Sequence, residues 1–191
     1  MPSQLFFRNL EIQGLKERKG KGKKEEKMME TRGRIFCDMD GVLTDFDGRF
    51  EYFTGLTPKE YEDTKGTEAF WNAITPIGKD FWSKMPWTPG GRRLWNFIKN
   101  YEPRLLTAPS QDVSSRIGKK EWVINNLTPI PKVIFKGAKY KHQAVKYPTD
   151  ILIDDRYDNI ARWRSAGGIG LHHPTNGDPS EVIEKLKELG F

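Results

Sequence analysis

Short apolar runs alternate with helix-patterned stretches along most of this chain, and this alternation constrains the fold more than any other feature. Five runs have the length of buried strands: 34–37, 104–107, 132–135, 150–153 and 168–171. Four stretches have apolar residues at helical spacing: 91–101, 114–127, 158–166 and 180–189. Strands that alternate with helices pair in parallel through right-handed crossovers. The pattern therefore predicts an α/β fold in which helices cover a parallel sheet.

The alternation is interrupted between residues 45 and 89. This segment contains Gly, Pro, many aromatic residues and three short helical stretches, at 58–63, 67–73 and 79–84, but no strand pattern. We interpret 45–89 as a small helical cap inserted after the first strand, with 34–44 and 90–191 forming the core domain. The cap aromatics have two readings, a small core of its own or a pocket that stacks a flat ligand. They are Phe70, Trp71, Phe81, Trp82 and Trp87.

The formal net charge of +6 is concentrated at the N-terminus. Residues 1–34 hold ten Lys/Arg and five Glu, whereas the rest of the chain holds 22 basic and 21 acidic residues. The Gly- and Lys-rich composition predicts that residues 1–33 are a disordered basic tail. The tail is either a solvated extension or a weak nucleic-acid contact, or translation starts at Met28 or Met29.

No apolar run has the length of a membrane span, and no secretory signal is visible. The single cysteine, Cys37, lies in an apolar run and cannot form an internal disulfide. These features predict a cytoplasmic protein without a membrane partner.

Chemically active side chains follow four of the predicted strands. In order along the chain they are Asp38 and Asp40, Thr107, Lys139 (with Lys136 and Lys141 nearby), and the pair Asp154 and Asp155. Ligands of open parallel sheets bind outside the carboxyl ends of the strands, so these groups are expected in one crevice. Clustered carboxylates indicate a hard cation such as Mg²⁺, and the added amine and hydroxyl indicate an anionic ligand. Phosphate meets both requirements.

The two carboxylates after the first predicted strand are expected to have different catalytic roles. Asp38 would attack phosphorus and form an acyl-phosphate, and Asp40 would protonate the leaving oxygen and later accept a proton from water. Gly41 would let the backbone turn closely past the phosphate. Each group taken alone has a plainer explanation as a capping, strand-forming or solvated residue. The prediction rests on their shared order, each after an apolar run.

Four segments, FCDMDGVLTDF, LLTAPS, FKGAK and ILIDDRYDNI, resemble in order the motifs of the haloacid dehalogenase superfamily of phosphotransferases. The resemblance spans about residues 34–172 and implies a Rossmann-like core, a three-layer sandwich, with a cap inserted after the first strand. It also implies that Asp38, the carbonyl of Asp40 and Asp155 bind Mg²⁺, with Asp154 supporting them.

A narrower resemblance is to the 5′(3′)-deoxyribonucleotidases and their phage and bacterial relatives. It implies that Lys139 is the catalytic lysine and that Phe46 stacks on or closes over a nucleoside. Gly41, Ala108 and Trp71 complete the expected substrate contacts. The sequence departs from this group at Ala108, where a second hydroxyl is expected, and at Gly137, where a basic residue is expected.

The expected activity is a Mg²⁺-dependent phosphomonoester hydrolase with an aspartyl-phosphate intermediate, acting as a 5′-nucleotidase on (deoxy)nucleoside monophosphates. One alternative is a phosphatase that processes 3′ or 5′ ends of nucleic acids, because the tail is basic and the cap is short. The other is a non-catalytic binding module with the same fold. The sequence leaves the base, the sugar, the phosphate position and the oligomeric state open.

Overall fold

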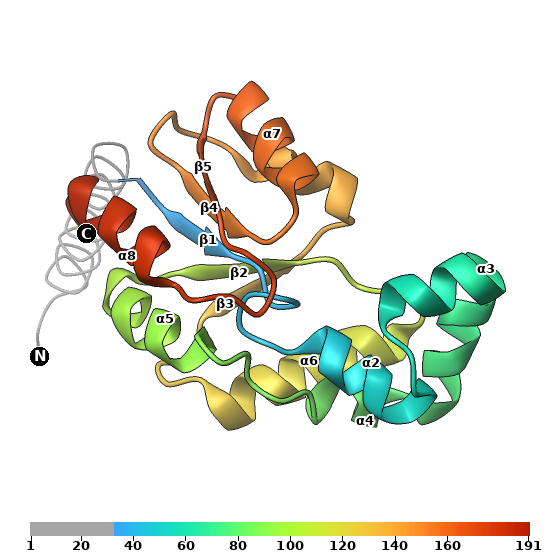
Figure 1. Ribbon diagram of the computed structural model, residues 1–191. Coiled ribbons are helices and arrows are strands. Elements are labelled where there is room, and N and C mark those ends of the chain that lie inside the picture. Colours follow the sequence, from blue (N-terminus) through green and yellow to red (C-terminus); the bar gives the residue numbers. More distant parts are fainter. Residues whose placement is uncertain (1–32) are drawn as a thin grey trace, which may run out of the picture.

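The computed structural model describes residues 33–191 and contains one five-stranded sheet (Figure 1). The strands are β1 (Ile35–Cys37), β2 (Arg104–Thr107), β3 (Lys132–Phe135), β4 (Ile151–Asp154) and β5 (Ile169–His172). Their spatial order is β3-β2-β1-β4-β5, and every neighbouring pair is parallel. Parallel pairing brings the carboxyl ends of all five strands to one edge of the sheet. The strand ends at which the sequence analysis placed the chemically active side chains therefore share one edge.

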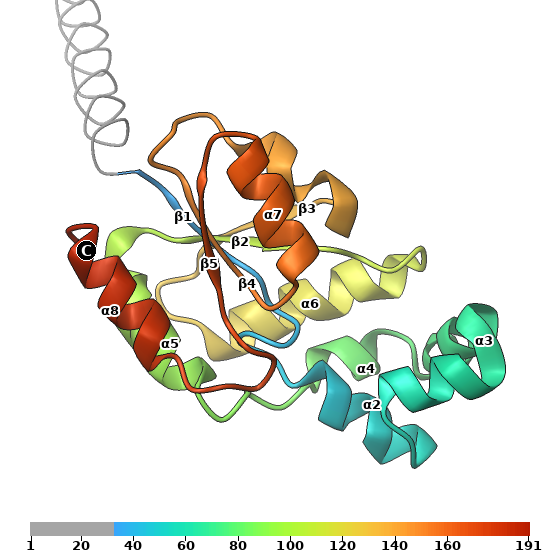
Figure 2. The ribbon, with the colours of Figure 1, turned by 45° about the horizontal axis from the view of Figure 1, so that its top comes forward.

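Helices cover both faces of this sheet (Figures 1 and 2). On one face lie α5 (Gly91–Ile98), α6 (Val113–Asn126) and α8 (Ser180–Glu188), which pack on Ile35 and Cys37 of β1. On the other face lie α7 (Tyr157–Ser165) and the 3₁₀ segment η3 (Ala138–Ala144), next to Phe36 of β1. Alternate residues of one strand thus enter opposite cores, which explains why the strands read as continuous apolar runs.

The segment between β1 and α5 is helical. It consists of α2 (Phe46–Thr54), α3 (Pro58–Ile74), η1 (Thr75–Ile77) and α4 (Lys79–Ser83), and a further 3₁₀ turn, η2 (Lys99–Tyr101), follows α5. α3 begins with a capping box between Thr57 and Glu60. At Gly66, φ is 82° and ψ is 163°, so the helix is broken there. This break separates the two stretches expected at 58–63 and 67–73.

The predicted fold class is confirmed, since the sheet is parallel and helices flank it on both sides. The sequence analysis missed three elements, α2, η1 and η3. α2 is short and is held by its ends: Asp45 accepts a hydrogen bond from the Gly48 N–H at 2.9 Å, and Gly55 closes the helix in the left-handed region. The predicted basic tail lies outside the described residues, apart from residue 33. Within 33–191 no helix has the length and apolar character needed to cross a bilayer.

Candidate active site

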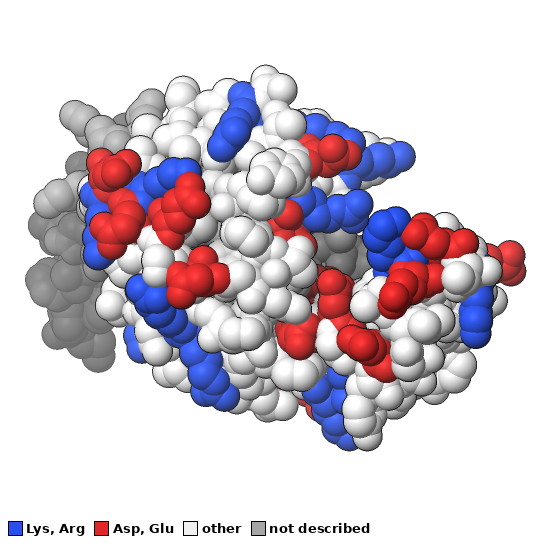
Figure 3. Space-filling view, viewed as in Figure 1, with Lys and Arg blue, Asp and Glu red and all other residues white. Residues whose placement is uncertain are grey.

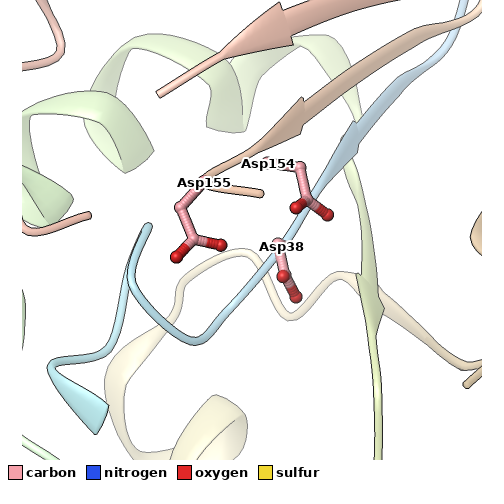
Figure 4. Close-up of side chains that lie close together, drawn as sticks. All are labelled: Asp38, Asp154 and Asp155. Carbon is pink, nitrogen blue, oxygen red and sulfur yellow. The ribbon is translucent and has the colours of Figure 1, made fainter. Parts of the chain in front are cut away.

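Three carboxylates meet at the carboxyl ends of β1 and β4 (Figure 4). Asp38 follows β1, Asp154 ends β4 and Asp155 comes directly after it. Each offers an oxygen atom that lies within 4.8 Å of the others, so the cluster could hold a metal ion. The backbone register places them there, because the Asp38 N–H donates to the Ile153 carbonyl at 2.9 Å.

Burial disfavours the ionised form of the carboxylates in this cluster. It raises the pKa of Asp155 to about 7, and the neighbouring charge of Asp38 adds to the shift. Burial, followed by the charge of Asp38, also raises the pKa of Asp154. A hydroxyl and an amide oppose these effects: Thr175 Oγ1 donates to Asp155 at 2.9 Å, and Asn159 Nδ2 donates to Asp154 at 2.9 Å. The cluster is therefore suited to a cation that would relieve the remaining repulsion.

The lysine of the cluster is Lys141, and the expectation that Lys139 occupies this place is corrected. Lys141 Nζ lies 2.5 Å from Asp38 Oδ2 and 2.7 Å from Asp154 Oδ2, and its side chain is buried. Burial disfavours its charge, but Asp38 and Asp154 outweigh this and raise the pKa of Lys141. Lys139 is exposed, with its ammonium 5.1 Å from the Tyr140 ring. The 3₁₀ turn η3 begins at Ala138, and it directs the side chain of Lys141 inward and leaves that of Lys139 in solvent.

A second buried lysine, Lys119 of α6, lies beside Asp40. Its ammonium donates to Asp40 Oδ2 at 2.6 Å, to Thr107 Oγ1 at 2.7 Å and to the Ala108 carbonyl at 2.9 Å. The other oxygen of Asp40 accepts a hydrogen bond from Thr44 at 3.2 Å. The carboxylate of Asp40 is thus held by Lys119 and lies outside the three-carboxylate cluster. Since Thr107 Oγ1 accepts from Lys119, its own hydroxyl hydrogen is free to point elsewhere.

Two glycines allow these groups to come so close. Gly41 has a φ of 75°, and a Cβ at this position would lie 2.4 Å from Asp155 Oδ2. Gly118 lies where α6 crosses α4, and a Cβ there would lie 2.3 Å from the Lys79 carbonyl and 2.7 Å from Trp82 Cβ. The first glycine admits the turn after β1, as the sequence predicted. The second lets Trp82 approach the ammonium of Lys119, which is 5.1 Å from its ring.

No family model and no curated protein matches the chain. Among solved structures, a haloacid dehalogenase-like family hydrolase from Xanthomonas campestris aligns with a TM-score of 0.51 at 14% identity, over 81% of this chain and 90% of that one. The chain has the fold of a haloacid dehalogenase-like hydrolase.

Two further structures align less closely. A hydrolase from Streptococcus pneumoniae has a TM-score of 0.47 at 15% identity, over 81% of this chain and 97% of that one. A haloacid dehalogenase family enzyme from Bacteroides thetaiotaomicron, complexed with magnesium and inorganic phosphate, has a TM-score of 0.43 at 13% identity, over 78% of this chain and 97% of that one.

A cavity of about 430 Å³ lies between α3 and the loop that joins β2 to α6. Its wall includes Trp71 and Trp82, and also the side chains of Glu68 and Asp112. The amides and hydroxyls of its wall are Thr67, Asn72, Thr75, Ser110, Gln111 and Ser114. Trp82 connects the cavity to the site, because it also contacts Lys119. Figure 3 shows acidic and basic side chains around the hollow between the α2–α3 lobe and the rest of the protein.

The other residues expected to contact substrate lie at different places. Trp71 is 40% exposed and lines the cavity. Phe46 does not line it, and its ring packs against Phe81 at 5.5 Å and Trp82 at 5.8 Å. Ala108 contributes its carbonyl to Lys119. Phe70, Phe81 and Trp82 are buried, so these three cap aromatics build a core that is continuous with the main one.

The sequence analysis missed Lys119, although a signal was present. In α6 the buried positions are Ser115, Gly118, Lys119, Trp122 and Val123, which share one helix face. A lysine at a position of that apolar face must reach a buried partner. Its neighbour Lys120 is exposed, and the sequence analysis assigned no role to either lysine.

Proposed function

We propose that this protein is a Mg²⁺-dependent phosphomonoester hydrolase in which Asp38 becomes phosphorylated. The observation that carries the proposal is the position of Asp38, which pairs with the ammonium of Lys141 and clusters with the carboxylates of Asp154 and Asp155. A carboxylate in that place can approach an anionic phosphoryl group only if cations neutralise both. Lys141 supplies one positive charge, and the cluster is built to hold another.

Asp38, Asp155 and the backbone carbonyl of Asp40 would hold the ion, with Asp154 supporting them. Oxygen ligands of this kind suit Mg²⁺. When bound, the ion neutralises phosphoryl charge and lowers the repulsion between the nucleophile and the substrate. Lys141 would donate to one phosphoryl oxygen, and the Thr107 hydroxyl would donate to another.

In the first step, an Asp38 oxygen attacks phosphorus and the bond between phosphorus and the leaving oxygen breaks. Asp40, in its protonated form, gives its proton to that oxygen, and the alcohol departs. In the second step, water attacks the acyl-phosphate while Asp40 accepts a proton from it. The bond between Asp38 and phosphorus then breaks, which releases inorganic phosphate and restores both carboxyl groups. Lys119 positions Asp40 for both transfers through the 2.6 Å hydrogen bond that it donates to Asp40 Oδ2.

We further propose that the substrate is a nucleoside monophosphate. The cavity beside the site supports this, because its volume lies within the range of small-ligand pockets. Trp71, which is 40% exposed, offers a flat apolar face, and the amides and hydroxyls of the wall offer hydrogen bonds to a base or a sugar. Glu68 and Asp112 disfavour additional phosphates inside the cavity, so a monophosphate fits better than a diphosphate or triphosphate.

A panel of nucleoside 5′- and 3′-monophosphates, sugar phosphates and p-nitrophenyl phosphate, assayed with Mg²⁺, tests both parts. We expect the nucleotides to be preferred, and Asp38→Asn to lower turnover by about 10³-fold or more. Asp158→Asn is the matched control, since Asp158 is an exposed carboxylate of α7 that forms a surface ion pair with Arg162. Equal rates on all phosphates would refute the nucleotide assignment. An Asp38→Asn protein with wild-type turnover would refute the mechanism.

A further inference from the structure

The charge of the described chain is strongly segregated. Residues 113–149 contain eight Lys/Arg and one acidic residue, Glu121. The flanking segments, 35–112 and 150–191, together contain 14 basic and 20 acidic residues. A nearly neutral body thus consists of one segment with a net charge of +7 and a remainder with −6.

Two of the eight cations, Lys119 and Lys141, are buried at the site. Five others are spread over α6, the edge strand β3 and the start of η3, and we call them the edge surface: Arg116, Lys120, Lys132, Lys136 and Lys139. None of the five takes part in an ion pair within residues 33–191. On the face shown in Figure 3, by contrast, acidic and basic side chains are interspersed.

Aromatic rings lie among these cations. The guanidinium of Arg116 lies 5.1 Å from the centre of the Phe135 ring, and the ammonium of Lys120 lies 5.9 Å from it. Tyr140, beneath Lys139, is 46% exposed. Lysine on an edge strand also prevents two sheets from pairing, and this accounts for Lys132. It does not account for the cations that α6 places over Phe135.

The edge surface adjoins the reacting groups. The backbone N–H of Lys136 donates to the Thr107 carbonyl at 3.1 Å. Lys139 lies two residues before Lys141, and Arg116 lies three residues before Lys119 on the same helix. A polyanion that follows the edge surface toward the carboxyl end of β3 would therefore bring its end to Asp38.

We propose that the edge surface binds the phosphate backbone of a single-stranded nucleic acid. Cations without an ion-pair partner neutralise successive phosphates, and the exposed ring of Tyr140 among them stacks on an unpaired base. Binding of the strand is independent of the proposed function. Delivery of its terminal phosphate to Asp38 rests on that function, and it would make the end of a strand a second substrate beside free nucleotides.

The test compares two variants of the full chain that lose the same charge. One is Arg116→Gln/Lys120→Gln/Lys136→Gln. The control, Lys59→Gln/Lys84→Gln/Lys187→Gln, removes three lysines that already have acidic partners on other faces. The probe is a fluorescent single-stranded 12-mer with a terminal phosphate, titrated by anisotropy in EDTA between 50 and 200 mM salt. The N-terminal residues are the same in both variants, so their contribution cancels.

We expect the edge variant to bind at least about tenfold more weakly at low salt. The slope of log K against log salt should fall in magnitude by about 2, which is three contacts at about 0.7 each. The control should keep the wild-type slope. Tyr140→Ala should weaken binding by about tenfold through lost stacking. Equal losses in the edge and control variants would overturn the proposal. The proposal would also be overturned if polyglutamate bound as tightly as the 12-mer, since the surface would then fit an acidic protein.

Turnover separates this inference from the proposed function. The edge variant should raise KM for release of phosphate from the 12-mer and leave hydrolysis of p-nitrophenyl phosphate unchanged. A wild-type protein that hydrolyses no phosphomonoester, but binds the strand through the edge surface, would refute the proposed function and support the binding site. If the protein hydrolyses nucleotides but the edge variant binds the strand as tightly as the wild type does, the binding site is refuted and the proposed function stands.

Discussion

Replacing Asp155 by Asn should stabilise the metal-free protein. Burial and the charge of Asp38 raise the pKa of Asp155 to about 7 from an ordinary value of 3.8. Because the folded-state pKa is the higher one, the folded protein favours the protonated form, and stability is lost as the pH rises from about 4 through about 7. The ionised group costs about 4 kcal/mol at pH 8, of which about 2.5 kcal/mol arises between pH 5 and pH 8.

Urea unfolding in EDTA at both pH values measures this cost. The free energy of unfolding of Asp155→Asn should exceed that of the wild type by about 4 kcal/mol at pH 8 and by less at pH 5. The difference between the two proteins cancels other titrations, such as that of His173, whose pKa is lowered by burial. Asp158→Asn, which removes an exposed carboxylate, should change stability by less than about 1 kcal/mol at either pH.

Magnesium supplies the second half of the test. A cation that binds only the folded protein stabilises it in proportion to RT ln(1 + [L]/Kd). The wild type should gain stability on addition of Mg²⁺ at pH 8, and Asp155→Asn should gain much less. If metal-free Asp155→Asn is no more stable than the wild type at pH 8, the electrostatic account of the cluster is wrong. If both proteins gain equally from Mg²⁺, Asp155 is not a ligand.

Three further substitutions test the site. Lys141→Met should lower turnover of a small phosphomonoester by about 10²-fold or more, whereas Lys139→Met should leave it unchanged; the opposite result would restore the sequence-based assignment. Lys119→Met should lower kcat by about 10²-fold with little change in KM, because a displaced proton donor affects the transition state more than binding; an unchanged kcat in steady-state assays would contradict this. Gly41→Ala should lower the free energy of unfolding by at least about 1–2 kcal/mol, since it combines a left-handed φ with a clash against Asp155; wild-type stability in urea would contradict it.

The strands and most helices were predictable because each is encoded locally. A buried parallel strand reads as a short apolar run, and Gly66 interrupts α3 at the place where the sequence shows a break. α2 was not predictable in this way. Its apolar pattern is weak, and it depends on Asp45 and Gly55 at its ends.

Asp38, Thr107, Asp154 and Asp155 were correctly placed at strand ends, because parallel pairing alone brings those ends together. The lysines were not. Lys139 and Lys141 are two residues apart in a lysine-rich stretch, and only the 3₁₀ turn η3 decides which of them is buried. Lys119 reaches the site from a helix, so no rule about strand ends could place it.

The two buried lysines explain how one edge of the sheet tolerates four carboxylates. Asp38 and Asp154 share Lys141, and Asp40 has Lys119, which leaves Asp155 as the member of the group without a lysine partner. Asp155 instead accepts a hydrogen bond from Thr175, and burial raises its pKa to about 7. Both lysines come from residues 113–149, the same segment that carries the edge surface. The positive charge of this segment is therefore divided, since its buried members balance the clustered carboxylates and its exposed members form the surface that we propose to bind nucleic acid.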